Sequence, residues 1–151
     1  MGKSSAPEVP SALETAIDAY RRGFVVKDEP YDGINFAFLL NERALVLRDD
    51  QRAEAIADFV NAERVRHRII ESGKDNLAAA EAEGPESKYW MQATMAEALY
   101  GVGRRPEALE LLAGAEPPEP WMRETTKRQL ERLGVLLEAS PLGAIADSDF
   151  K

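Results

Sequence analysis

One stretch of the sequence, KYWMQATMAEALY (residues 88–100), places four chemically useful side chains at i, i+4, i+7 and i+10. These side chains are Trp90, Thr94, Glu97 and Tyr100. In an α-helix this spacing puts them on one face. An aromatic pair with a carboxylate between suits a peptide that carries apolar and basic groups. We therefore predict a partner-binding face here; the alternative is packing in the core, because tryptophan is usually largely buried.

The chain offers few residues for catalysis or metal binding. His67 is its only histidine, and there is no cysteine. A histidine metal cluster or a catalytic triad is therefore excluded or sharply restricted. His67 stands in the basic run Arg64-Val65-Arg66-His67-Arg68, whose charges disfavour its protonation. We expect a surface or packing residue rather than a base.

The acidic residues form no recognisable site. Glu81, Glu83 and Glu86 lack the alternating Asp, Asn and Gly of a calcium loop, so a solvated connection is the better interpretation. Asp147 and Asp149 near the end of the chain are equally unconvincing as a site. No glycine-rich phosphate-binding motif occurs. We expect a protein that is not an enzyme and needs no metal or cofactor.

Two helical hairpins must position the predicted face. The second, about residues 87–116, turns at Gly101 and Gly103 and resumes at Pro106, whose fixed φ suits a first helical turn. The first, about 31–72, contains a helix that is apolar nearly all round, which indicates burial from both sides. Small and large residues recur in both hairpins with a constant offset of 108 − 55 = 53 residues: Ala55, Phe59 and Ala62 match Ala108, Leu112 and Ala115.

The remaining segments complete a single predicted domain over residues 11–139. Covering helices are expected at about 12–24, with Ser11 and Glu14 as a capping box, and at about 121–138. We expect a short helix or a loose loop over residues 74–86. Residues 1–10 are expected to be a flexible lead-in and 140–151 a tail. The fold class is all-α, a tetratricopeptide-like right-handed stack of antiparallel hairpins with about six helices.

Composition limits the classes of function. The chain has 151 residues, 44% of them hydrophobic, which is enough for one domain with a core. A net charge of −8 argues against nucleic acid as a partner and favours basic partners. The N-terminus lacks the apolar region of a secretory signal, and no run is long enough to span a bilayer. We expect no membrane association and a soluble cytoplasmic protein.

Two separated motifs carry a family resemblance. They are Tyr-x-Gly-Ile-Asn before an apolar helix and Tyr-Trp-x-x-Ala-Thr-x-x-Glu-Ala further on. Their residues here are Tyr31, Gly33, Ile34 and Asn35, then Tyr89, Trp90, Ala93, Thr94, Glu97 and Ala98. The chain thereby resembles the tetratricopeptide-like TRAF-binding domain of apoptosis signal-regulating kinases and their bacterial relatives, over about residues 12–135. The kinases' region is longer, and this chain has no kinase motifs.

The resemblance implies a helical scaffold that binds signalling proteins, without naming the partner. Our first hypothesis is therefore a non-catalytic protein-interaction scaffold whose partner is a protein or peptide with basic or apolar groups. A second is a regulatory module that binds a small ligand between helices near Tyr31, Asn35 and Tyr89. A third is a structural module that pairs with a second copy of the chain.

Overall fold

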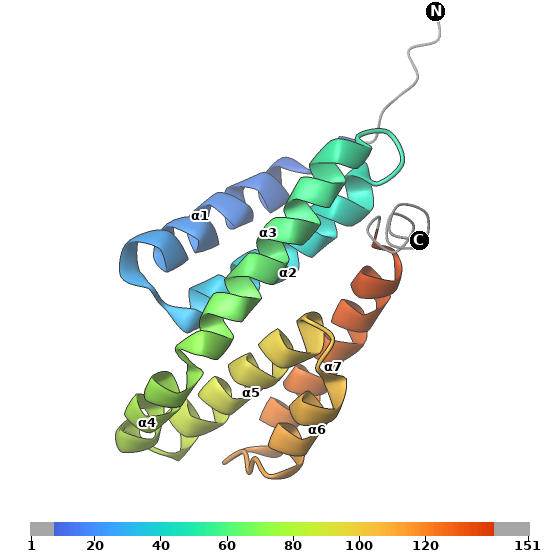
Figure 1. The fold of residues 1–151 in the computed structure, drawn as a ribbon. Coiled ribbons are helices and arrows are strands. Elements are labelled where there is room, and N and C mark those ends of the chain that lie inside the picture. The colour runs from blue at the N-terminus through green and yellow to red at the C-terminus, as the bar shows by residue number, and fades with distance from the viewer. Residues whose placement is uncertain (1–7, 141–151) are drawn as a thin grey trace, which may run out of the picture.

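The computed structural model describes residues 8–140, and over this range the chain is all-helical, as predicted (Figure 1). Seven helices follow one another with short connections. They are α1 (Ser11–Lys27), α2 (Pro30–Leu47), α3 (Arg52–Glu71), α4 (Gly73–Glu83), α5 (Pro85–Gly101), α6 (Arg105–Ala113) and α7 (Pro120–Glu138). The expected tail, with Asp147 and Asp149, lies outside the described residues except for its first position. Most of the expected lead-in also lies outside them.

The prediction of about six helices is wrong by one, and α4 is the addition. Three consecutive alanines favour a helix in this segment, because alanine has the highest helix propensity. Gly73 is the first residue of α4, and Ser72 occupies the C-cap of α3. Gly84, with a φ of 134°, then separates α4 from α5. Such a φ is open to glycine at little cost, which explains why the chain breaks there.

Prolines, rather than capping side chains, begin several helices. The predicted Ser11–Glu14 capping box is wrong: Pro10 is the N-cap of α1, and no side chain bonds the cap. Glu14 instead accepts a hydrogen bond from Arg43 of α2 at 3.1 Å. α2 begins at Pro30. Proline suits a first turn because the backbone N–H that it lacks would be unbonded there.

The α2 helix lies at the centre of the fold, as its nearly continuous apolar character predicts. It packs against α1, α3, α5 and α7. The largest core cluster joins α2 to side chains of α1, α3 and α5. Its buried members are Ile17, Phe24, Ile34, Phe36, Ala37, Leu40, Ala62, Val65, Ile69 and Ala98.

The recurring alanines mark places where helices approach closely. Ala55, Ala62 and Ala108 have no exposed surface, and Ala115 has 1%. Ala55 and Ala62 of α3 pack against α2 in the first hairpin. Ala108 of α6 packs against α5 in the second hairpin. Ala115 lies beyond the end of α6 and packs with Tyr89 and Met122.

The last helix returns to the central one. Figure 1 shows α1, α2 and α3 as one group and α4 to α7 as a second. α7 packs on both α5 and α2, and its Arg132 forms an ion pair with Glu42 of α2, 90 residues earlier. α2, α4, α5 and α7 all line one common space.

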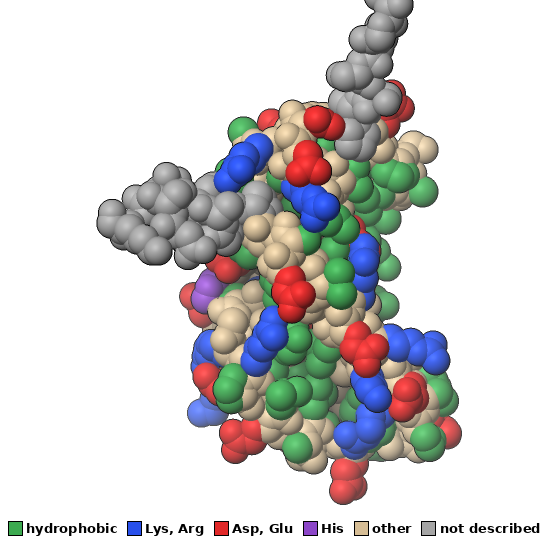
Figure 2. Space-filling model, turned by 90° about the vertical axis from the view of Figure 1, so that its right-hand side faces the viewer, with side chains coloured by type: hydrophobic (Ala, Val, Ile, Leu, Met, Phe, Trp, Pro, Cys, Tyr) green, Lys and Arg blue, Asp and Glu red, His purple; other side chains and the backbone are tan. Residues whose placement is uncertain are grey.

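The surface carries charges of both signs. On the face drawn in Figure 2, hydrophobic side chains gather in the lower half between Lys, Arg, Asp and Glu side chains, and neither sign of charge dominates. Within residues 8–140, no helix combines the length and the apolar character needed to cross a membrane.

Candidate functional site: an acidic cleft

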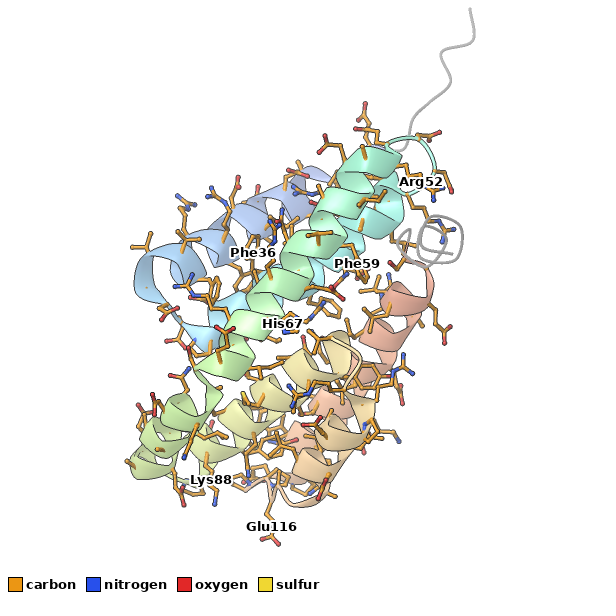
Figure 3. All side chains as sticks on the ribbon, viewed as in Figure 1. Phe36, Arg52, Phe59, His67, Lys88 and Glu116 are labelled. Carbon is orange, nitrogen blue, oxygen red and sulfur yellow. The ribbon has the colours of Figure 1, made fainter. Side chains whose placement is uncertain are left out.

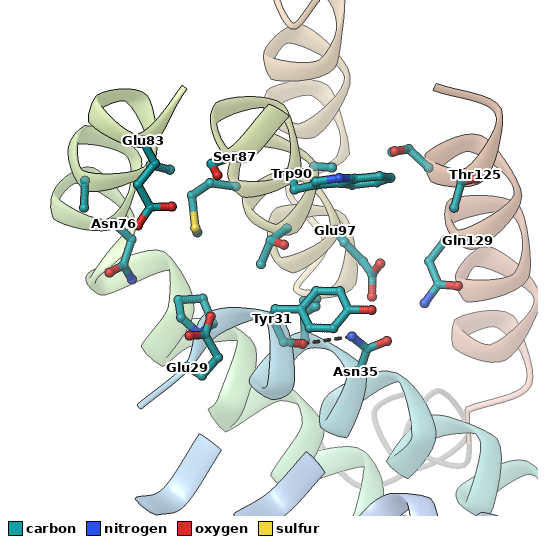
Figure 4. A pocket seen from close by; sticks show the side chains of 18 residues that line it. Glu29, Tyr31, Asn35, Asn76, Glu83, Ser87, Trp90, Glu97, Thr125 and Gln129 are labelled. Atoms are coloured by element: carbon teal, nitrogen blue, oxygen red, sulfur yellow. Dashed lines mark hydrogen bonds between the residues drawn. The ribbon is translucent and has the colours of Figure 1, made fainter. Parts of the chain in front are cut away.

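A cleft of about 820 Å³ lies between α2, α4, α5 and α7 (Figure 4). The N-terminal end of α2 forms one side, and α4 and α7 flank α5. Its lining residues are Glu29, Pro30, Tyr31, Ile34, Asn35, Asn76, Ala79, Ala80, Glu83, Ser87, Trp90, Met91, Ala93, Thr94, Glu97, Thr125, Thr126 and Gln129.

The charge of the cleft is entirely negative. Glu29, Glu83 and Glu97 contribute carboxyl groups, and no Lys or Arg stands among the lining residues. A cleft lined by one sign of charge between low-dielectric walls concentrates the field and attracts opposite charge. The cleft is therefore suited to a cationic group.

Aromatic rings form part of the wall. Trp90 packs edge-on against Tyr89, with ring centroids 5.3 Å apart, and its other neighbour is Trp121 at 6.1 Å. Trp121 is 58% exposed. The ring of Tyr31, 56% exposed, lies across the cleft from Trp90 (Figure 4). Aromatic faces attract cations as well as apolar groups.

Glu97 is the buried acid of the cleft. Its side chain is 7% exposed, and burial raises its pKa to about 7, against the opposing effects of the Arg66 charge and a hydrogen bond from Gln129. Among the described residues, its Oε2 atom has no hydrogen-bond partner. Figure 4 shows its carboxyl group pointing into the space between Trp90 and Tyr31.

A buried arginine lies behind Glu97. Arg66 of α3 has no exposed surface, and its Nη2 donates to Asn41 Oδ1 at 2.6 Å. Burial lowers its pKa to about 10, although the charges of Glu97 and Glu63 act in the opposite direction. Its Nε and Nη1 have no hydrogen-bond partner within residues 8–140. This polar cluster joins α2, α3 and α5 beneath the cleft.

Gly101 makes room for that arginine. A Cβ atom at this position would lie 2.3 Å from Arg66 Cδ, far inside contact distance. Gly101, which is predicted from the sequence to lie in the turn, is thus the last residue of α5, and its lack of a side chain leaves space for Arg66. The turn itself uses Gly103, with a φ of 89°.

Three of the four residues predicted on the binding face line the cleft. Trp90, Thr94 and Glu97 do so, whereas Tyr100 does not. The Tyr100 ring lies under the Arg105 guanidinium, 4.6 Å from its centroid, and close to Gly134 of α7. Tyr100 therefore lies apart from the other three, because the beginning of α6 covers this end of α5.

Of the three residues predicted to contact a small ligand, the structure places two in the cleft and one outside it. Tyr31 and Asn35 line the cleft, and Asn35 Nδ2 donates to the Tyr31 carbonyl at 2.9 Å. Tyr89 does not line it. It is 1% exposed, and its hydroxyl lies 2.8 Å from Thr126 Oγ1. Tyr89 therefore joins α5 to α7.

The other residues of the two motifs serve packing and shape. A Cβ on Gly33 would lie 2.4 Å from the Phe24 ring, so α1 and α2 need glycine there to approach so closely. Ile34 and Ala93 are buried beside the cleft, and Ala98 is buried in the main core.

Sequence reasoning missed the roles of Arg66 and Asp58. Arg66 falls four residues after Ala62 and three before Ile69, which is the spacing of the apolar stripe of α3, and this was the signal for burial. Asn41 is recognisable as a polar residue on a buried helix, and Arg66 is its partner. Asp58 is only 5% exposed and accepts two hydrogen bonds from Arg43 at 2.8 and 2.9 Å.

His67 is exposed on α3 (Figure 3), in keeping with a surface residue. Glu81 forms an ion pair with Lys88 at 3.7 Å. In the described part of the chain, no three His, Asp or Glu side chains gather in a way that could hold a metal ion.

The fold and the cleft define an all-helical domain with an acidic, aromatic-walled cleft. Compared with known proteins, the chain matches no family model, no curated sequence and no solved structure. The resemblance to the TRAF-binding domain family therefore stays a prediction that rests on the two motifs alone.

Proposed function

We propose that the protein is a non-catalytic interaction scaffold that binds a segment of another protein in the acidic cleft. The cleft itself carries this proposal: three carboxyl groups and aromatic rings face one space that contains no basic side chain. Such a surface complements a segment that carries basic and apolar side chains. A role in signalling rests on the family resemblance.

The arrangement of the hairpins is in keeping with a tetratricopeptide-like stack. The first helices of the two hairpins, α2 and α5, pack together and both line the cleft. α7 then packs on both of them, which makes the cleft deeper than an open stack of two hairpins would. A deep cleft suits a short segment or an end of a partner chain better than a broad flat surface does.

One observation favours a second candidate, a regulatory module for a small ligand. The cleft volume of about 820 Å³ is within the usual range of small-molecule sites, about 300–1,000 Å³. Tyr31 and Asn35, the residues predicted for such a ligand, are both part of it. Tyr89 has no part in this site.

Two neighbouring alanines of α4 provide a matched test. Ala79 lines the cleft and Ala78 does not, although both are exposed. Ala79→Arg would place a long basic side chain at the cleft, whereas Ala78→Arg makes the same change in charge and volume outside it. Wild type and both variants are used as bait in lysate of the native cell, with bound proteins identified by mass spectrometry.

We expect a protein that wild type and Ala78→Arg retain and Ala79→Arg loses. Circular dichroism checks that all three baits are equally helical. A partner that Ala79→Arg retains as well as wild type does would refute the cleft as the binding surface. A metabolite that raises the melting temperature of wild type but not of Ala79→Arg would favour the small-ligand module.

A further inference from the structure

We propose that the Glu97 end of the cleft is a subsite for a guanidinium group, supplied by an arginine of the bound segment. This inference rests on the proposed function and adds the chemical class that the cleft selects. Three features carry it: a buried carboxyl group, the rings on either side of it, and the amide oxygen of Asn35.

The carboxyl group lacks a cation in contact with it. Glu97 is 7% exposed, and its Oε2 has no hydrogen-bond partner among the described residues. Within residues 8–140, Glu97 forms no ion pair with a Lys, Arg or His side chain, and the charge of Arg66 acts on it without such a contact. A buried carboxylate is costly unless a cation and hydrogen bonds compensate it. A cationic ligand in the cleft would supply both.

The walls of this subsite fit a flat cation. Figure 4 shows the Glu97 carboxyl group between the indole of Trp90 and the phenol ring of Tyr31. A guanidinium is planar, stacks on aromatic faces and is more weakly hydrated than an ammonium, so it loses less on leaving water. These properties favour arginine over lysine.

Asn35 adds a further hydrogen-bond acceptor to the cleft. Asn35 donates through Nδ2 to the Tyr31 carbonyl, which leaves its Oδ1 as an acceptor. Gln129 extends from α7 toward the same space (Figure 4), and its amide donates a hydrogen bond to Glu97 that helps to hold the carboxyl group in place. A guanidinium carries five N–H donors in a fixed fork, whereas an ammonium has three on one atom. The carboxylate of Glu97 and the amide oxygen of Asn35 offer acceptors on more than one residue, which also favours the guanidinium.

The subsite is tested with small probes that differ only in the group concerned. N-acetyl-arginine amide is titrated into ¹⁵N-labelled protein at pH 8, where Glu97 is largely ionised. N-acetyl-citrulline amide is the neutral control of nearly equal shape, and N-acetyl-lysine amide is the ammonium control. The chain has two tryptophans, so Trp121→Phe identifies the indole N–H signal of Trp90.

We expect the arginine probe to give a saturable shift of the Trp90 signal. Citrulline should bind at least about tenfold more weakly, since it lacks the charge, and so should the arginine probe on Glu97→Gln. Glu110→Gln, which removes an exposed carboxyl group of α6, should bind as wild type does. Equal binding of citrulline, equal binding by Glu97→Gln, or equal binding of lysine would overturn the guanidinium subsite.

A library of random peptides, displayed and selected on the protein, separates this inference from the proposed function. Selected peptides that share an arginine and lose binding when it becomes citrulline would support both. Selected peptides that lack arginine and are blocked by Ala79→Arg would leave the scaffold standing and refute the subsite. A third outcome is that the arginine probe binds saturably but no selected peptide is blocked by Ala79→Arg. This outcome would refute the scaffold and retain the subsite as a site for a small guanidinium compound.

Discussion

Glu97→Gln is expected to stabilise the fold at neutral and alkaline pH, even though it removes a side chain of the proposed binding site. The substitution keeps the shape of the side chain and removes its ionisation. Burial of Glu97 raises its pKa to about 7, which means that the folded state disfavours the charged form. An amide in the same place avoids that cost.

The sign of the pH dependence follows from the raised pKa. A carboxyl group whose pKa is higher in the folded state contributes its stability below the unfolded pKa of 4.5. It loses this contribution as pH rises through about 7. The whole shift corresponds to about 3 kcal/mol, at about 1.4 kcal/mol per pH unit. Between pH 5 and pH 8, wild type should lose about 2 to 3 kcal/mol relative to Glu97→Gln.

Urea unfolding, followed by far-ultraviolet circular dichroism at several pH values between 5 and 8, measures this difference. Comparing the two proteins at each pH cancels the contributions of the other titrating groups. Glu110→Gln, which removes an exposed carboxyl group, controls for the change in net charge. Its difference from wild type should stay nearly constant across the range.

A difference between wild type and Glu97→Gln that does not change with pH would refute the reasoning. It would mean that Glu97 has an ordinary pKa and so is either hydrated or paired with Arg66. A difference that changes in the opposite direction would mean that Arg66 lowers the pKa of Glu97 by more than burial raises it.

Two further substitutions test the packing that holds the cleft. Gly33→Ala should lower the free energy of unfolding by about 2 kcal/mol in urea titrations, because its Cβ would lie 2.4 Å from the Phe24 ring. Gly114→Ala, whose Cβ would meet only ordinary contacts at 3.8 Å, should be close to neutral, and equal effects would refute the clash. Arg43→Ala should lower the melting temperature and cost about 2 kcal/mol, because it leaves Asp58 buried without its two hydrogen bonds.

An exposed ion pair provides the control for the arginine substitution. Arg104 of the α5–α6 turn pairs with Glu107, and both side chains are about half exposed. Arg104→Ala should leave the melting temperature unchanged, since exposed pairs contribute little in water. If Arg43→Ala also leaves the melting temperature unchanged, the contact between Arg43 and Asp58 is not important for stability.

The sequence determined the class of fold and much of the local structure. Apolar spacing identified the helices of both hairpins, and the all-round apolar character of α2 correctly predicted its central position. The recurring alanines are buried where α3 packs on α2 and α6 on α5. These features are local: periodicity and residue size act within one helix or between consecutive ones.

Part of the candidate site was also determined by the sequence. Trp90, Thr94 and Glu97 share a face because of helical spacing, and the structure places all three in the cleft. Tyr100 has the same spacing but lies outside the cleft, because α6 begins beside it and places Arg105 on its ring. Periodicity reports which residues share a face and not which neighbour covers it.

Only the tertiary structure decided the depth and the electrostatics of the site. α7 returns to α2, where Arg132 pairs with Glu42, and it adds Thr125, Thr126 and Gln129 to the wall of the cleft. Arg66, which looks like one member of a basic run, is buried against Asn41 because its position on α3 faces α2 and α5. The raised pKa of Glu97 follows from the burial of its carboxyl group. It arises from the joint burial of groups on α2, α3, α5 and α7, which are distant in sequence and meet only when the chain has folded.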